Sequence, residues 1–144
     1  MKFRLATPLD AERLAYIETQ QPLSAHWGAK GFASETIQPS ARVWCWEENG
    51  EVLGFLAMRL TAGFGEILNL AVLPQACRQG IGFRLITKAL ADAREKDGHE
   101  ITLEVNVHNT PAISLYMKAG LKELGRREKF YNNQDDALIM GITL

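Results

Sequence analysis

The stretch 70-LAVLPQACRQGIGF-83 joins an apolar segment to a helical one through a loop that carries an arginine and two glycines. Residues 65–73 are nearly continuous in apolar side chains after Glu66, which predicts a strand that is buried on both faces and ends at Pro74. From residue 80 to about residue 97, apolar side chains recur at helical spacing, at Ile81, Leu85, Ile86, Ala89, Leu90 and Ala93. The stretch therefore predicts a strand–loop–helix unit.

The loop itself, Arg78-Gln79-Gly80-Ile81-Gly82-Phe83, has the chemistry of an anion-binding site. Glycines let backbone amides approach a phosphate, and the first turn of a helix offers unpaired N–H groups and the positive end of its dipole. Arg78 adds a charge-assisted contact. A glycine turn that only reverses the chain explains the same residues, because Gly80-x-Gly82 is neither a full GxGxxG nor a GxxxxGK[ST] phosphate loop. From the loop alone, both interpretations stay open.

Turn and cap signals predict the elements that precede this unit. Asn49-Gly50 is the dipeptide that best suits a tight type I′ hairpin turn, because both positions tolerate a positive φ. Thr7 can cap a helix that begins at Pro8. In chain order we expect a strand at 2–7, a helix from Pro8 to about residue 20, a connection at 21–31, a weaker helix at 32–38, and strands at 43–48 and 51–60.

The elements that follow complete a mixed sheet. Residues 101–107 alternate between apolar and polar side chains, as a strand requires. Asn109-Thr110-Pro111 opens a helix that Gly120 ends. Two further strands are expected at 121–130 and 137–143, joined by a polar loop at 132–136. With no internal repeat and no linker, residues 1–144 are predicted to form one α/β domain with helices on the faces of its sheet.

Bulk composition excludes several classes of protein. Sixteen basic and 17 acidic residues give a formal charge of −1, which argues against direct nucleic-acid binding. Residues 1–5 are too short and too charged for a signal peptide, and no apolar run is long enough to span a membrane, so a cytoplasmic location is expected. Cys45, Cys77 and the three scattered histidines show no metal-ligand spacing, so no metal is expected.

Two side chains downstream are candidates for proton transfer. Glu104 lies on the polar face of the strand 101–107, where a carboxylate needs an ion-pair partner, such as an arginine, or a catalytic role. Tyr116 lies one helical turn past Ile113, where a core aromatic and a proton donor are both consistent with the spacing. The basic segment 126–129 is interpreted as a solvated strand end, with the tip near Phe130 and Tyr131 as an alternative lining of a peptide entrance.

The phosphate-type loop, together with the apolar residues before it, resembles the coenzyme A signature [Q/R]-x-x-G-x-[G/A] of the GNAT acetyltransferase superfamily. Cys77 stands where that signature usually has Gln or Arg. The resemblance implies a single-domain GNAT fold, with a mixed, mostly antiparallel sheet splayed between its fourth and fifth strands and helices on both faces. It also implies that acetyl-CoA is the acetyl donor, held by Leu70, Ala71, Val72, Arg78, Gln79, Gly80, Ile81, Gly82 and Phe83.

A longer stretch, from residue 103 to residue 121 and on through 125–140, resembles one branch of that superfamily, the ribosomal-protein alanine N-acetyltransferases (RimI-like). Residues 26–32 are similar to the PWS-x-x-x-F segment of this branch, with Pro and Ser replaced. The resemblance implies Glu104 as general base, Tyr116 as general acid and Asn109 as a contact to the coenzyme. The implied partner is the N-terminus of a protein or peptide, ribosomal protein included.

Two alternatives to this function stay open. The first is a small-amine or antibiotic N-acetyltransferase, which would acetylate free amines and have little activity on peptides. The second is a non-catalytic module that senses acyl-CoA, an idea prompted by Cys77 in the signature. Retention of both Glu104 and Tyr116 speaks against the second alternative.

Overall fold

The computed structural model describes residues 2–21, 23, 25–130 and 135–144, with Arg78 described by its backbone alone. The elements follow the predicted order of strands and helices. They are β1 (Lys2–Leu5), the 3-10 helix η1 (Pro8–Asp10), α1 (Ala11–Thr19), α2 (Gly28–Glu35), β2 (Ala41–Glu48), β3 (Glu51–Thr61), β4 (Phe64–Val72), the 3-10 helix η2 (Pro74–Gln79), α3 (Ile81–Glu95), β5 (Glu100–Asn106), α4 (Thr110–Lys118), β6 (Lys122–Arg127) and β7 (Ala137–Thr143).

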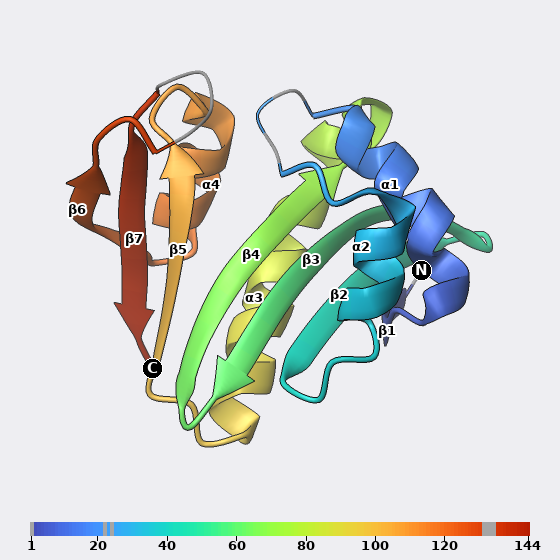
Figure 1. Ribbon diagram of the computed structural model, residues 1–144, viewed down its shortest axis with the longest axis horizontal. Coiled ribbons are helices and arrows are strands. Elements are labelled where there is room, and N and C mark those ends of the chain that lie inside the picture. The colour runs from blue at the N-terminus through green and yellow to red at the C-terminus, as the bar shows by residue number, and fades with distance from the viewer. Residues whose placement is uncertain (1, 22, 24, 131–134) are drawn as a thin grey trace.

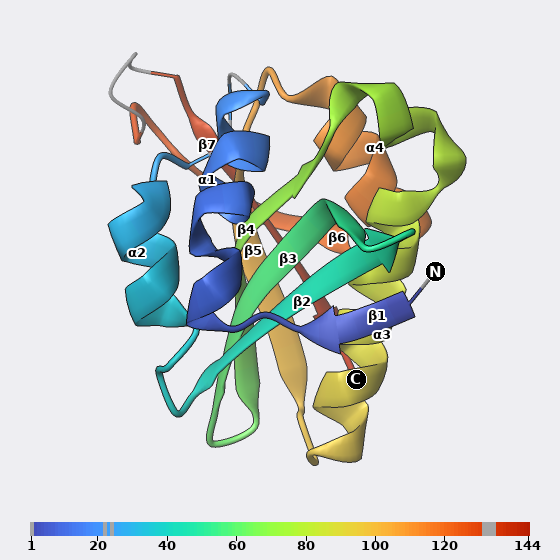
Figure 2. The same ribbon diagram turned by 90° about the vertical axis from the view of Figure 1, so that its right-hand side faces the viewer.

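The strands form one sheet in the order β1-β2-β3-β4-β5-β7-β6. Neighbouring strands are antiparallel except for β4 and β5, which are parallel. Figure 2 shows α1 and α2 on one side of the sheet and α3 and α4 on the other. The predicted mixed sheet with helices on both faces is therefore confirmed. No helix within the described ranges is both long and apolar enough to cross a membrane.

Each face of the sheet has its own apolar core. Trp44 and Trp46 of β2 point to the side covered by α3, where they join a cluster with Leu85 and Ile86. The alternate residues of β2 point to the side of α1 and α2, where they pack with Leu14, Ile17, Phe32 and Phe55. This alternation is what a strand between two helical layers requires. The middle residues of β2 and β3 are consequently mostly buried on both faces.

Local sequence signals correctly predicted several boundaries of helices and strands. Asn49 and Gly50 have φ angles of 51° and 76°, as the predicted hairpin turn requires. Thr7 and Asp10 form a capping box, in which the Thr7 side chain accepts from the amide of Leu9 and the Asp10 carboxylate accepts from the amide of Thr7.

Two predictions need correction. The second helix begins at Gly28, not at residue 32, because the buried carboxylate of Glu18 accepts hydrogen bonds from the amides of Trp27 and Gly28 and so caps its first turn. In addition, β4 is not fully buried on both faces. Leu68 and Leu70 are only half-buried, because they line a groove.

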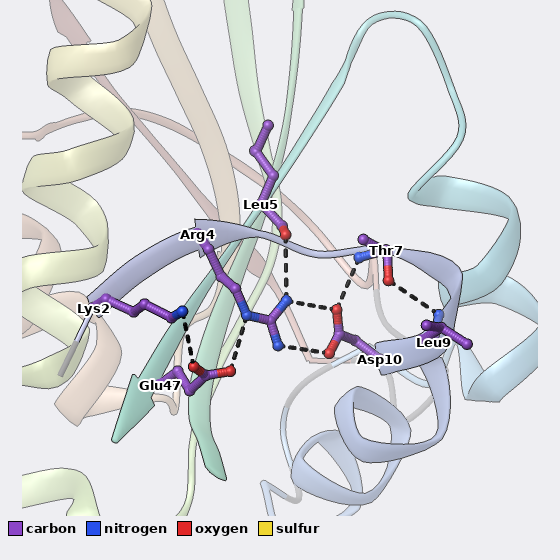
Figure 3. Close-up of polar contacts among 7 residues, drawn as sticks. All are labelled: Lys2, Arg4, Leu5, Thr7, Leu9, Asp10 and Glu47. Atoms are coloured by element: carbon purple, nitrogen blue, oxygen red, sulfur yellow. Dashed lines mark hydrogen bonds and ion pairs between the residues drawn. The ribbon is translucent and has the colours of Figure 1, made fainter. Parts of the chain in front are cut away.

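Ion pairs join elements that are far apart in the sequence. Figure 3 shows Arg4 of β1 between Asp10, which it contacts with two nitrogens at 2.8 Å, and Glu47 of β2 at 3.0 Å. On the other side of the sheet, Arg42 of β2 donates two hydrogen bonds of 2.9 Å to the buried carboxylate of Asp92 on α3. Such bidentate pairs fix the orientation of both partners.

Acidification is expected to weaken the ion pairs Arg4–Asp10 and Arg42–Asp92. Hydrogen bonds from Arg4 hold the pKa of Asp10 below its ordinary value of 3.8. Burial raises the pKa of Asp92, but the hydrogen bonds and charge of Arg42 outweigh burial, so this pKa also lies below 3.8. The stabilisation by both carboxylates is therefore complete above the ordinary pKa and is lost as the pH falls through the depressed values.

Urea unfolding between about pH 5 and about pH 2 should show a falling free energy of unfolding. Asp92→Asn should make this fall shallower. Glu95→Gln, which changes an exposed acid on the same helix, should leave its slope unchanged. A slope that is equal in all three proteins would show that the Asp92 pair is not part of the acid response.

Candidate active site

A groove opens where β4 and β5 separate. The two strands pair from Phe64 and Glu100 as far as Ile67 and Leu103, where their pairing ends. In the register between β3 and β4, Leu68 is an extra residue, so a bulge lies at the point of separation. Figure 1 shows the upper halves of β4 and β5 diverging. The groove has a volume of about 1260 Å³ and confirms the splayed sheet that the resemblance implies.

The groove connects the two sides of the sheet. The connection between α1 and α2 contributes Gln21, Leu23, Ala25 and His26, whereas α3 and α4 contribute residues from the opposite side. Nine of the residues predicted for the site line it, namely Leu70, Ala71, Val72, Gly80, Gly82, Phe83, Glu104, Asn109 and Tyr116. Gln79 and Ile81 do not line it. The side chain of Ile81 is buried in the core, so only its backbone can take part.

The loop before α3 has the geometry of an anion site. Gly80 has a φ of 75°, a left-handed conformation that glycine adopts without strain. The amide of Arg84 donates to the carbonyl of Gly80 at 3.0 Å, which closes the first turn of α3. The amides of residues 81–83 precede this bond and have no partner within the helix. They lie beside the groove at the positive end of the helix dipole.

α3 packs closely against α4 beside the groove, which both Gly82 and Leu115 line. A Cβ atom on Gly82 would lie 2.8 Å from a terminal carbon of Leu115, so the absence of a side chain lets the two helices approach. Asn109 caps α4, because its side chain accepts from the amide of Ala112 at 3.4 Å. Asn109 therefore has a structural role as the cap of α4, in addition to its predicted contact with the coenzyme.

Glu104 and Tyr116 reach the groove from opposite faces of the sheet. Tyr116 is buried in the cluster on the α3 and α4 side, together with Leu103 and Val105 of β5. Glu104 alternates with those two residues and so points to the other side. There its Oε1 atom accepts a hydrogen bond of 2.8 Å from Nη1 of Arg127, the ion pair with an arginine that the sequence left as one interpretation.

Comparison with known proteins agrees with this geometry. Residues 9–121 match a family model described as the acetyltransferase (GNAT) family. The chain belongs to the GNAT family. As a GNAT protein it is an acetyl-CoA-dependent N-acetyltransferase. No cluster of three or more His, Cys, Asp or Glu that could hold a metal ion occurs in the described part of this GNAT chain.

Individual relatives are consistent with this family. The chain is 31% identical over 134 residues to the [ribosomal protein bS18]-alanine N-acetyltransferase of Escherichia coli K12, covering 90% of this chain and 89% of that protein. It is 35% identical over 111 residues to an N-alpha-acetyltransferase of Sulfurisphaera tokodaii, covering 68% and 66%. The structure of Arabidopsis thaliana NAA60 in complex with acetyl-CoA superposes with a TM-score of 0.88 at 20% identity, covering 99% and 98%.

Several groove residues of this GNAT chain were not predicted. Gln21 donates through Nε2 to the carbonyl of Val72 at 2.7 Å, and the exposed thiol of Cys77 lies 3.5 Å from the same oxygen. Arg127 and Phe130 line the groove from the end of β6 and the loop after it. No local motif marks Gln21, since its partner lies 51 positions away. The sequence does raise the tip near Phe130 and Tyr131 as an alternative lining of a peptide entrance; Phe130 lines the groove, whereas Tyr131 lies outside the described residues.

Proposed function

We propose that the chain transfers the acetyl group of acetyl-CoA to the N-terminal α-amino group of a protein, with the N-terminal alanine of a ribosomal protein as the leading acceptor. The observation that carries this proposal is the groove through the sheet, with a tyrosine on one face and a carboxylate on the other. The relatives named above act on α-amino groups by their names, which supports the choice of acceptor.

The cofactor enters from the side of α3 and α4 in this proposal. The amides of residues 81–83 would hold its pyrophosphate, with Arg78 and Gln79 beside them, and the backbone of Leu70, Ala71 and Val72 would pair with its pantetheine arm. Hydrogen-bond donors at a helix N-terminus suit a phosphate. Asn109 would contact the coenzyme from the start of α4.

The acceptor enters from the side of α1 and α2. An α-amino group has an ordinary pKa near 8, so Glu104 needs to remove only one proton, directly or through a water, to leave a nucleophilic amine. The amine nitrogen attacks the thioester carbonyl, and the carbon–sulfur bond breaks. Tyr116 donates a proton to the departing thiolate of coenzyme A, and the second proton that the nitrogen loses as the amide forms replaces it on the phenol by way of solvent. A lysine amine, with an ordinary pKa of about 10.4, would be harder to deprotonate.

Thiol release tests the proposal against its alternatives. Purified protein would be given acetyl-CoA with short peptides that differ only in their first residue, with free lysine and an aminoglycoside as controls. Release with an alanine peptide and little release with the controls would support α-amino transfer. Preference for the aminoglycoside would support the small-amine alternative. Binding of acetyl-CoA with no release from any acceptor would support the sensor module.

Gly80→Ala is expected to raise the KM for acetyl-CoA about tenfold, which corresponds to about 1.4 kcal/mol. A Cβ atom at Gly80 meets nothing within 4 Å, but alanine at a φ of 75° is strained and would turn the following amides. Gly50→Ala is the matched control, because Gly50 has a φ of 76° and equally open surroundings in the β2–β3 hairpin. Both variants should lose about 1 kcal/mol of stability. If the two variants have the same KM for acetyl-CoA, the loop has no role in cofactor binding.

The cytoplasmic location and the absence of nucleic-acid and membrane partners stay predictions from the sequence. A ribosomal protein as the target rests on the names of relatives and on the resemblance of residues 103–140. The peptide series above addresses the first residue of the acceptor directly.

A further inference from the structure

The carboxylate of Glu104 is held by a residue from a strand that it does not neighbour. Glu104 pairs with Ile139 of β7, and Ile139 pairs with Gly125 of β6, so these three form one row across the sheet. Arg127 lies two positions beyond Gly125 on β6 and therefore on the same face. Its side chain reaches over β7 to place Nη1 at 2.8 Å from Oε1 of Glu104.

The side chain of Arg127 has neighbours on β7 and an aromatic contact after β6. On that face of β7, Arg127 is paired with the small residue Ala137, and Ile139 is the next residue toward the row of Glu104. The guanidinium carbon lies 4.1 Å from the centre of the Phe130 ring, in cation–π contact. Arg127, Phe130 and Glu104 all line the groove. The arginine is thus held between an aromatic ring and the carboxylate.

Resting on the function proposed above, we infer that Arg127 is a positioning residue, which fixes the carboxylate of Glu104 for removal of the acceptor's proton. A charge-assisted hydrogen bond to Oε1 confines a side chain that has three rotatable bonds. No hydrogen bond to Oε2 occurs among the described residues, so Oε2 is the atom available to the acceptor amine or a bridging water. The base then acts through one oxygen while Arg127 occupies the other.

Arg126 provides a matched control from the same strand. Its side chain is 54% exposed, equal to the 54% of Arg127. As the neighbouring residue on a strand it points to the opposite face, where it pairs with Asp136 at 3.4 Å. Arg126→Gln therefore removes the same charge from the same strand and leaves Glu104 in place.

The test measures steady-state kinetics of wild type, Arg127→Gln, Arg127→Lys and Arg126→Gln with an alanine peptide. Arg127→Gln should lower kcat roughly tenfold to 100-fold, because a misplaced catalytic group loses rate steeply. The KM for acetyl-CoA should stay within about twofold, since the cofactor binds on the other face. Arg127→Lys should recover part of the loss, because it retains the charge. Arg126→Gln should resemble wild type.

A double-mutant cycle separates positioning from any other role. If Arg127 acts through Glu104, then Arg127→Gln added to Glu104→Gln should reduce kcat no further than Glu104→Gln alone. A full additional loss in that background would overturn the inference, as would an Arg127→Gln enzyme that is as active as Arg126→Gln. An inactive wild type would instead remove the proposed function, so the two failures are distinguishable. Equal thermal midpoints for Arg127→Gln and Arg126→Gln would exclude unfolding as the cause.

Discussion

Glu104→Gln is expected to lower kcat about 100-fold at neutral pH and to make the remaining activity rise steeply with pH. The amide keeps the shape of the side chain but cannot accept the proton of the acceptor amine. The amine must then lose its proton to solvent before it binds productively, and its neutral fraction grows up to an ordinary pKa near 8. Measurement of kcat/KM for an alanine peptide from about pH 6 to about pH 9 checks this.

Glu66 offers a matched control for this variant. It is another carboxylate that lines the groove, and it lies on β4 where β4 still pairs with β5. Glu66→Gln should keep the wild-type pH dependence of kcat/KM, because Glu66 lies in the part of β4 that is still paired with β5. A wild-type profile in Glu104→Gln would count against Glu104 as the base. It would then favour the simpler interpretation, in which Glu104 serves only to hold β6 through Arg127.

Much of the fold could be predicted because its signals are local. The positive φ angles at Asn49 and Gly50, the cap at Thr7 and the alternation within β5 all depend on residues a few positions apart. The start of α2 could not be predicted in this way. It depends on the carboxylate of Glu18, which caps the helix from ten positions upstream and is itself held by Asn69 of β4 at 2.9 Å.

The candidate site likewise has features that local sequence reveals and features that depend on the tertiary structure. The loop around Gly80 was identifiable because a left-handed glycine before a helix and the helix N-terminus are consecutive in sequence. The partner of Glu104 could not be identified from the sequence, since Arg127 is recognised as its neighbour only when the sheet order β5-β7-β6 is known. Nor could spacing reveal that Glu104 and Tyr116 face opposite sides of the sheet. That arrangement follows from which face of β5 carries Leu103 and Val105.

Tyr116→Phe is expected to lower kcat about 100-fold while the affinity for acetyl-CoA stays nearly unchanged. Tyr116 is 6% exposed and packs in the core on the α3 and α4 side, so phenylalanine should preserve that packing. In the proposed reaction the hydroxyl acts when the thiolate of coenzyme A departs and needs a proton, which a phenol with an ordinary pKa near 10 can supply. An interaction made only at that step appears in kcat and not in ground-state binding.

Titration calorimetry with acetyl-CoA and single-turnover thiol release, measured on the same preparation, separate the two quantities. Tyr16→Phe is the control, because Tyr16 is 50% exposed on α1 and lies outside the groove lining, so its loss of a hydroxyl should change neither quantity. Unchanged turnover in Tyr116→Phe would remove the phenol from the reaction. Loss of cofactor binding would instead give Tyr116 a role in shaping the cofactor side of the groove. Slow turnover with intact binding is the result that fits a proton donor, because the proposed proton transfer to the leaving group contributes to the transition state and not to ground-state binding.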